Sequence, residues 1–197
     1  MKADGSRLDI SGKTGCYRNL FQNCASLTTA PALLASALAD YCYTSMFRNC
    51  TSLTSSPELP ATAVAGWCYA SMFAGCKSLT VPPALPATTL ADSCYYQMFW
   101  DCASLTGDVA VVLAQTSTIP GNALYKMFRN TAGQSRLTFT LDMSGFAAVP
   151  QLPSPDTMSV FDSASDVRLT IKVPASLLTT WKESSNWSNF ADRIVAA

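Results

Sequence analysis

The sequence predicts an α/β solenoid, because one pattern of residues recurs at a fixed spacing along half of the chain. The eight cysteines fall into two sets that share a period of 26 residues. The sets are Cys16, Cys42, Cys68 and Cys94, and Cys24, Cys50, Cys76 and Cys102. Between them the motif CYxxMFxxCxSLT is intact at 42–54, 68–80 and 94–106. A fixed period of this length is typical of solenoids, because a single unit cannot bury its apolar face and must stack on its neighbours.

Two weaker copies extend the array toward the C-terminus. The segment ALYKMFRNT at 123–131 keeps the Met-Phe pair, and MSVFDSA at 158–164 keeps only Phe161 at the matching place. We therefore expect a single domain of about six right-handed coils. Its expected parts, within residues 1–197, are 26-residue repeats from 16 to about 119, degenerate repeats over about 120–174 and a C-terminal cap over about 175–197.

The weaker copies also indicate where the strands lie. SRLTFTLD at 135–142 and DVRLTIKVP at 166–174 alternate apolar and polar residues. Both contain the Leu-Thr pair of the intact repeats, so we expect an inward-pointing leucine at one strand position of every coil, with outward-pointing neighbours. These leucines are Leu27, Leu53, Leu79, Leu105, Leu137 and Leu169. The Pro-rich links PELPAT and PPALPAT cannot be helical, and we expect extended turns there.

The motif CYxxMFxxC predicts a short helix in each copy. On a helical wheel every recurring residue of the copy at 42–50 lies on one face. The variable positions Tyr41, Thr44, Ser45, Arg48 and Asn49 lie on the other face, which should be exposed. The residue just before each helix is Asp40, Gly66 or Asp92, where an N-cap is expected. The column Tyr17, Tyr43, Tyr69 and Tyr95 should belong to the core.

Three states of the cysteines fit this architecture. Equivalent cysteines of adjacent coils have parallel Cα–Cβ directions, which suits a disulfide badly, and free cysteine is a good small core residue. We therefore favour columns of reduced, buried thiols. Some disulfides remain an alternative, and a metal site is the least favoured because Cys-x2-Cys spacing and histidine are both missing.

Composition narrows the function classes. The chain has 13 Lys and Arg against 13 Asp and Glu, so it has no net positive field to attract nucleic acid. Its longest apolar stretch is far below the ~20 residues that span a bilayer, and MKADGSRLDI lacks the apolar core of an export signal. Without histidine, and with only two glutamates, the Ser-His, Cys-His and paired-carboxylate mechanisms have no candidates. We expect no enzyme activity, no cofactor and no membrane insertion.

The motif MFxxCxSLT followed by LPATTLA resembles the BspA-like leucine-rich repeats of surface proteins from host-associated bacteria. The tail IKVPASLLTTWKESSNWSNFADRI at 171–194 resembles the closing segment of such arrays, a last strand followed by an amphipathic capping helix. The resemblance covers about residues 14–195. It implies a right-handed leucine-rich-repeat solenoid that is secreted or displayed on the cell surface. It also implies adhesion to host extracellular proteins or glycans, with no catalytic motif to carry over.

Two surfaces are candidates for binding. Exposed aromatic residues on the helical side could stack on sugar rings or anchor a protein, and hydroxyl and cationic residues on the strand side could bind a glycan or an acidic loop. The candidate residues are Trp67, Tyr96 and Trp100 on the helical side, and Arg136, Thr138, Arg168, Thr170 and Lys172 on the strand side. The alternatives are packing between neighbouring coils for the first group and an ordinary solvated sheet face for the second.

These observations favour a monomeric, non-enzymatic recognition or adhesion module that is exported from the cell and binds a host protein or glycan. A structural spacer that displays another domain is one alternative. A carbohydrate-capture protein is another, and it requires the aromatic columns to be exposed.

Overall fold

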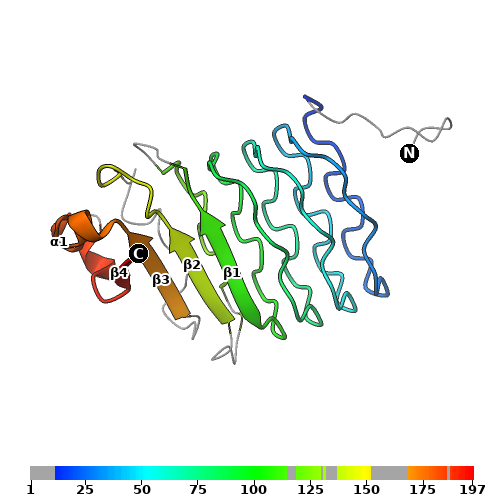
Figure 1. Cartoon of the computed structure of the whole chain (residues 1–197). Coiled ribbons are helices and arrows are strands. Elements are labelled where there is room, and N and C mark those ends of the chain that lie inside the picture. Colours follow the sequence, from blue (N-terminus) through cyan, green and yellow to red (C-terminus); the bar gives the residue numbers. More distant parts are fainter. Residues whose placement is uncertain (1–11, 115–118, 130, 132–136, 152–167, 186) are drawn as a thin grey trace.

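The computed structural model describes residues 12–114, 119–129, 131, 137–151, 168–185 and 187–197. In these residues four parallel strands form one sheet in the order β1-β2-β3-β4, and one short α-helix follows β3 and precedes β4 along the chain (Figure 1). The elements are β1 Gly107–Val112, β2 Leu137–Asp142, β3 Arg168–Val173, η2 Ala175–Leu177, α1 Leu178–Glu183, η3 Ser188–Phe190 and β4 Ile194–Ala196. The fold is therefore α/β, and it is consistent with the predicted repeat solenoid.

The CYxxMFxxC segments are not helices. Alternate backbone amides bond in two directions: Tyr43 N–H donates to Cys68 O of the next copy (2.9 Å), whereas Met46 N–H donates three residues back to Tyr43 O (3.1 Å). One residue in four has a positive φ, as at Ser45 (54°) and Asn49 (61°), which an α-helix does not allow. We call these segments the turn ribbons, residues 15–24, 41–50, 67–76, 93–102 and 122–129. A left-handed residue every fourth position turns the chain with nearly the period of a helix, so the apolar spacing could not tell the two apart.

The recurring residues of the ribbons point inward, as predicted. In the copy at 42–50 they are the buried Cys42, Tyr43, Met46, Phe47 and Cys50. The predicted outward set is correct for Tyr41, Arg48 and Asn49. It is wrong for Thr44 and Ser45, which are only 8% and 7% exposed. Burial of Thr44 is compensated because its Oγ1 donates to the carbonyl of Trp67 at 2.6 Å.

The predicted helix caps are also wrong, because they join one copy to the next instead. The Asp40 carboxylate accepts the backbone N–H of Gly66 at 2.8 Å, 26 residues further along the chain. A Cβ at Gly66 would lie 3.2 Å from the same carboxylate oxygen. Asp40 and Gly66 occupy equivalent positions in neighbouring copies. The Asp40 carboxylate fills the space that a side chain at position 66 would need, which explains why aspartate and glycine alternate at this position.

The Pro-rich links lie in the same layer as the strands. Thr106 N–H donates to Thr80 O (2.9 Å) and Ala114 N–H donates to Thr88 O (2.7 Å), which aligns residues 81–87 with residues 107–113. The inward positions match, with Pro83, Leu85 and Ala87 beside Val109, Val111 and Leu113, all buried. The prediction that the links are extended is confirmed, but they are sheet-layer segments rather than turns. Because proline has no N–H, only isolated bridges such as Ser55 with Val81 form between the early copies.

The strand leucines face inward but do not share one strand position. Leu53, Leu79, Leu105, Leu137 and Leu169 are buried, and Leu27 is half-buried. In the sheet, however, Leu137 pairs with Gly107 and Leu169 pairs with Phe139. Each weaker copy is displaced by two residues, which keeps every side chain on its face because strand side chains alternate with a period of two.

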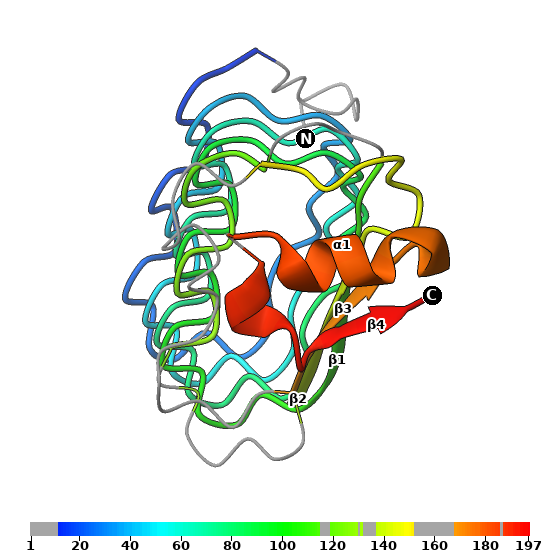
Figure 2. The same cartoon turned by 90° about the vertical axis from the view of Figure 1, so that its left-hand side faces the viewer.

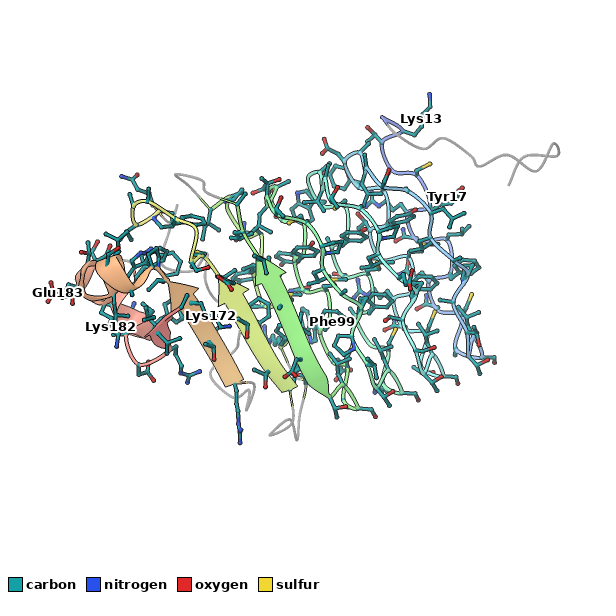
Figure 3. The ribbon with its side chains drawn as sticks, in the orientation of Figure 1. Lys13, Tyr17, Phe99, Lys172, Lys182 and Glu183 are labelled. Carbon is teal, nitrogen blue, oxygen red and sulfur yellow. The ribbon has the colours of Figure 1, made fainter. Side chains whose placement is uncertain are left out.

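Aromatic side chains run through the core as parallel stacks. Phe21, Phe47, Phe73, Phe99 and Phe128 lie at successive centroid distances of 5.6, 5.7, 5.7 and 5.5 Å. Tyr17, Tyr43, Tyr69 and Tyr95 form a second stack at 6.0, 6.0 and 5.9 Å, and the last three rings are buried as predicted. Figure 3 shows Phe99 inside the stack of copies and Tyr17 near the N-terminal end.

The C-terminal segment places a large apolar group across one end of the core. Trp181 of α1 and Trp187 are both 0% exposed and pack edge to face at 4.8 Å. Trp187 Nε1–H donates to the carbonyl of Pro150 at 3.0 Å. Figure 2, viewed from this end, shows α1 lying across the stack with β4 beside β3. β4 was not predicted. Among the described residues, no helix is long and apolar enough to cross a membrane.

Candidate functional site

The first candidate surface is an aromatic ladder on the outside of the turn ribbons. Tyr41 stacks on Trp67 (6.1 Å, 14° between planes), Trp67 lies 5.3 Å from Tyr96, and Tyr96 stacks on Tyr125 (5.4 Å, 18°). Trp67 and Tyr96 come from different columns of the repeat. The residue equivalent to Tyr96 in the copy of Trp67 is Ala70. Its side chain is too small to separate Trp67 from Tyr96, so the two rings meet. We call Tyr41, Trp67, Tyr96 and Tyr125 the aromatic ladder.

The faces of the ladder rings are already covered. Tyr41 stacks on Trp67 and Tyr96 stacks on Tyr125, whereas the contact between Trp67 and Tyr96 is tilted by 41°. The Arg18 guanidinium lies 5.6 Å from the Tyr41 centroid, and the Lys126 ammonium lies 4.7 Å from the Tyr125 centroid. Cations over ring faces are favourable, so both ends of the ladder are stabilised from within the chain. Since a sugar ring stacks on the face of an aromatic ring, the ladder offers mainly ring edges to a ligand. This geometry supports the packing interpretation of Trp67 and Tyr96.

Trp100 lies in a different column from the ladder. The guanidinium of Arg129 lies 5.1 Å from its ring centroid, so one face of Trp100 is occupied. The sequence grouped Tyr96 with Trp100 on the face of a predicted helix, but the segment is a turn ribbon and Tyr96 contacts Trp67 and Tyr125 instead. The structure thus keeps Trp67 and Tyr96 together and separates Trp100 from them.

The second candidate surface is the outward face of the sheet layer, which we call the sheet surface. On β2 and β3 it carries Thr138, Thr140 and Asp142 beside Arg168, Thr170 and Lys172. The strand register places Thr138 next to Arg168, Thr140 next to Thr170 and Asp142 next to Lys172. Figure 3 shows Lys172 on this face. Four of the five predicted strand-side residues therefore lie together, and the fifth, Arg136, is outside the described residues.

The hydroxyl groups in the early copies already have partners. Thr80 Oγ1 donates to Thr54 O and Thr106 Oγ1 donates to Thr80 O, both at 3.1 Å. Each acceptor is the same carbonyl that accepts the backbone N–H of the donating threonine. These threonines therefore strengthen the contact between copies, and their hydrogens are not free for a ligand.

An apolar row that sequence reasoning missed crosses the sheet surface. Leu34 is 46% exposed, Val112 is 56% exposed, and Pro60 and Pro86 lie between them in the equivalent positions of the intervening copies. Charged side chains lie near the row, with Glu58 beside Pro60 in its link, Asp108 in the same strand as Val112 and Asp142 of β2 paired with Val112. Arg168 and Lys172 lie one strand further on, in β3. The spacing of 26 residues between Leu34, Pro60, Pro86 and Val112 was visible in the sequence. The sequence did not show that the Pro-rich links belong to the sheet layer, so these four residues could not be assigned to one surface.

The thiols form two columns, and all eight are free. Six are buried, as predicted for core residues, whereas Cys24 is exposed and Cys16 is half-buried. In the second column the S–H groups of Cys50, Cys76 and Cys102 donate to the phenylalanine carbonyls of the preceding copy at 3.0 to 3.1 Å. Burial raises the pKa of Cys50 to about 11 and that of Cys76 to about 12. Buried thiols of this kind are poor nucleophiles, because the thiolate is the reactive form.

Among the described residues, no group of three or more cysteine, aspartate or glutamate side chains could hold a metal ion. The hydroxyl of Tyr69 is buried without a hydrogen-bond partner, between Tyr43 and Tyr95 in the core stack. It lies away from both candidate surfaces, and burial raises the pKa of this phenol above its usual value.

No protein-family model matches this chain. A comparison with curated proteins likewise gives no match. The functional argument therefore depends on the surfaces of the molecule itself.

Proposed function

We propose that this chain is a non-enzymatic recognition module that binds a partner protein through the sheet surface. In this proposal the chain is a leucine-rich-repeat solenoid of about six coils, closed by the C-terminal segment as a cap and working outside the cell or on its surface. The resemblance of MFxxCxSLT and of the 171–194 segment to BspA-like repeats supports this assignment.

The observation that carries the proposal is the composition of the sheet surface. A row of exposed apolar residues from Leu34 to Val112 lies beside acidic residues, Glu58, Asp108 and Asp142, and basic residues follow on β3, Arg168 and Lys172. Protein interfaces combine an apolar centre with a polar rim that excludes water, and complementary charges fix the register of the partner. A rigid stack with many bonds between copies holds these groups in place, so little conformational entropy is lost on binding.

Glycan capture is the less favoured function. It would use the aromatic ladder, whose ring faces are covered by neighbouring rings, by Arg18 and by Lys126. A spacer role predicts no binding at either surface, and the apolar row argues against it, because contiguous exposed apolar groups are typical of interaction sites.

The test is binding of the labelled chain to an array of extracellular matrix proteins and polysaccharides. Two variants address the sheet surface, Val112→Asp and the double variant Arg168→Ala with Lys172→Ala. Arg48→Ala, on the exposed side of a turn ribbon, is the matched control. We expect a protein ligand whose binding falls at least ~10-fold in Val112→Asp and is unchanged in Arg48→Ala. A hit lost only in Trp67→Ala would favour glycan capture or another use of the ladder, and a silent array with folded protein would favour the spacer.

A further inference from the structure

A shallow hollow of about 290 Å³ opens between two neighbouring Pro-rich links on the sheet surface. It is lined by Ser56, Pro57, Glu58, Leu59, Pro60, Pro83, Ala84 and Pro86. Pro57, Leu59 and Pro83 point inward and are buried, whereas Glu58, Pro60 and Pro86 are exposed. The hollow therefore has an apolar floor, with one carboxylate among its exposed lining residues.

Hydrogen-bond acceptors outnumber donors around this hollow. Among the described residues, no backbone–backbone hydrogen bond joins 57–61 to 83–87. Four of the eight lining residues are prolines, so the lining has eight backbone carbonyls but only four backbone N–H groups. Carbonyls that would accept ladder bonds in a regular sheet accept none between these two segments, and few N–H groups are available to them. The hollow is therefore suited to a ligand group that only donates.

Charge points to the same kind of ligand. Glu58 is the one ionisable residue of the lining, and its exposed carboxylate adds a full negative charge to the row of carbonyl dipoles. The exposed acidic residue Asp108 lies on the same surface, in the adjoining β1. An anionic ligand would be repelled, and a neutral apolar ligand would leave the acceptors without partners.

We propose that this hollow receives an arginine side chain of a partner polypeptide. A guanidinium has five N–H donors in one plane and no acceptor, and it can form two parallel bonds to a carboxylate. Its flat faces and methylene stem pack on apolar surfaces such as proline rings, whereas an ammonium is a compact and strongly hydrated charge. The exposed Leu34 and Val112, in the same row as Pro60 and Pro86, would contact apolar residues that flank the arginine.

This inference rests on the proposed function, since it names the chemistry of the partner that the sheet surface would bind. The burial of the link prolines also excludes a second possibility, that the Pro-rich links themselves are ligands for a polyproline-binding domain. Pro57-x-x-Pro60 and Pro83-x-x-Pro86 match the spacing of polyproline ligands, which present both prolines on one face. Here the first proline of each pair is buried and the second is exposed, so neither link can be read as such a ligand.

The test uses the full chain, labelled with nitrogen-15, and three short blocked peptides of sequence Leu-X-Leu. X is arginine, lysine or citrulline, which has the shape of arginine without its charge. Binding is followed by the amide shifts of Glu58, Leu59 and Ala84, with Leu141 of β2 as the internal control. We expect the arginine peptide to shift the three amides and to bind about threefold to fivefold more tightly than the citrulline peptide, as a partly exposed charge pair allows.

Glu58→Gln should remove this preference, and Asp108→Asn, which removes an exposed acid outside the hollow, should keep it. Equal binding of the arginine and citrulline peptides, or shifts confined to β2, would overturn the inference. If the array finds a protein ligand sensitive to Val112→Asp while the peptides do not bind, the recognition function stands and only the arginine site fails. A dimer in sedimentation that dissociates in Glu58→Gln would overturn the assignment to a foreign partner, because a side chain of a second copy would then be the occupant.

Discussion

The sheet layer is built in two ways along one chain, and both ways give the same inward face. β1 and β2 are joined over six consecutive residue pairs, whereas residues 57–61 and 83–87 share no backbone hydrogen bond. Yet Leu59 and Leu85 point into the core as Leu141 does. The sheet layer therefore does not need continuous backbone hydrogen bonding between its segments. The hydrogen bonds on either side of each Pro-rich link, together with the burial of its inward side chains, already fix which of its residues point inward and which point outward.

The turn ribbons explain how the early copies hold together without a regular sheet. Alternate residues of each ribbon donate to the next copy, as at Phe47 to Met72 O (3.0 Å) and Phe73 to Met98 O (3.0 Å). Aromatic rings and thiols stack behind these bonds. The N-terminal half thus depends on its ribbons, while the C-terminal half also has β1 to β4. This division can be tested at three levels.

The largest effect is expected from truncating the aromatic stack, which runs through both halves. Phe73 lies within the stack, and Phe139 of β2 contacts its last ring, Phe128, at 5.3 Å. Both are 0% exposed, so Phe73→Ala and Phe139→Ala should each lower the free energy of unfolding by about 3–5 kcal/mol in urea titrations. Arg48→Ala, at an exposed position, should cost under ~0.5 kcal/mol. A loss in only one of the two halves would mean that the core is not continuous between them.

Hydrogen exchange should then separate the two halves of the sheet layer. The amide of Leu141 lies in a strand paired on both sides, whereas Leu85 has no ladder partner in the adjacent links. We expect the Leu141 amide to exchange at least ~100-fold more slowly than the Leu85 amide, although both side chains are buried. The Phe73 amide, bonded within the ribbons, should resemble Leu141. Equal protection of Leu85 and Leu141 would show that the links are bonded after all.

Alkaline pH should act on the N-terminal half, where all eight cysteines lie. Burial raises the folded-state pKa of Cys76 and Cys94 to about 12, whereas a thiol in the unfolded chain ionises near ~8.5. The unfolded chain therefore loses these protons first. Each thiol's contribution to stability is complete below about pH 8.5 and declines as the pH rises toward 12, by about 1.4 kcal/mol at pH 9.5.

Urea titrations at pH 7.5 and 9.5 measure this decline. Cys76→Ala should be less stable at both values but should lose less between them than the wild type. Cys24→Ala removes an exposed thiol and serves as the control, with the wild-type dependence expected. An unchanged pH dependence in Cys76→Ala would indicate that this thiol ionises equally in the folded and unfolded chains.

Local conformation was predicted less well than the repeat itself. The positions of Phe73, Cys76 and Leu79 in the core followed from their recurrence, and burial confirms them. The prediction of helices was wrong. A turn ribbon has one left-handed residue in every four, so its apolar residues recur with nearly the period of a helix. Ser45, Asn49 and Gly75 at positive φ were the available signal, since asparagine and glycine are favoured in that region.

The candidate sites divide in the same way. Arg168, Thr170 and Lys172 were placed on one face because strand alternation has a fixed period, and the sheet places them there. Trp67 and Tyr96 were grouped with Trp100 by helical spacing, yet they join a ladder with Tyr41 and Tyr125. Tyr125 was missed because its copy is 29 residues from the one before, which hides its alignment with Tyr96.

The sequence by itself determined that this protein is a stack of repeated units and that the recurring residues of each unit are buried, because recurrence at a fixed period is a property of the chain. Only the tertiary structure decided that Pro-rich links stand in the sheet layer and that the rings of the ladder cover one another. Both depend on what lies beside a residue in the next copy: proline has no N–H to offer there, and an aromatic face is free only where the neighbouring copy leaves space.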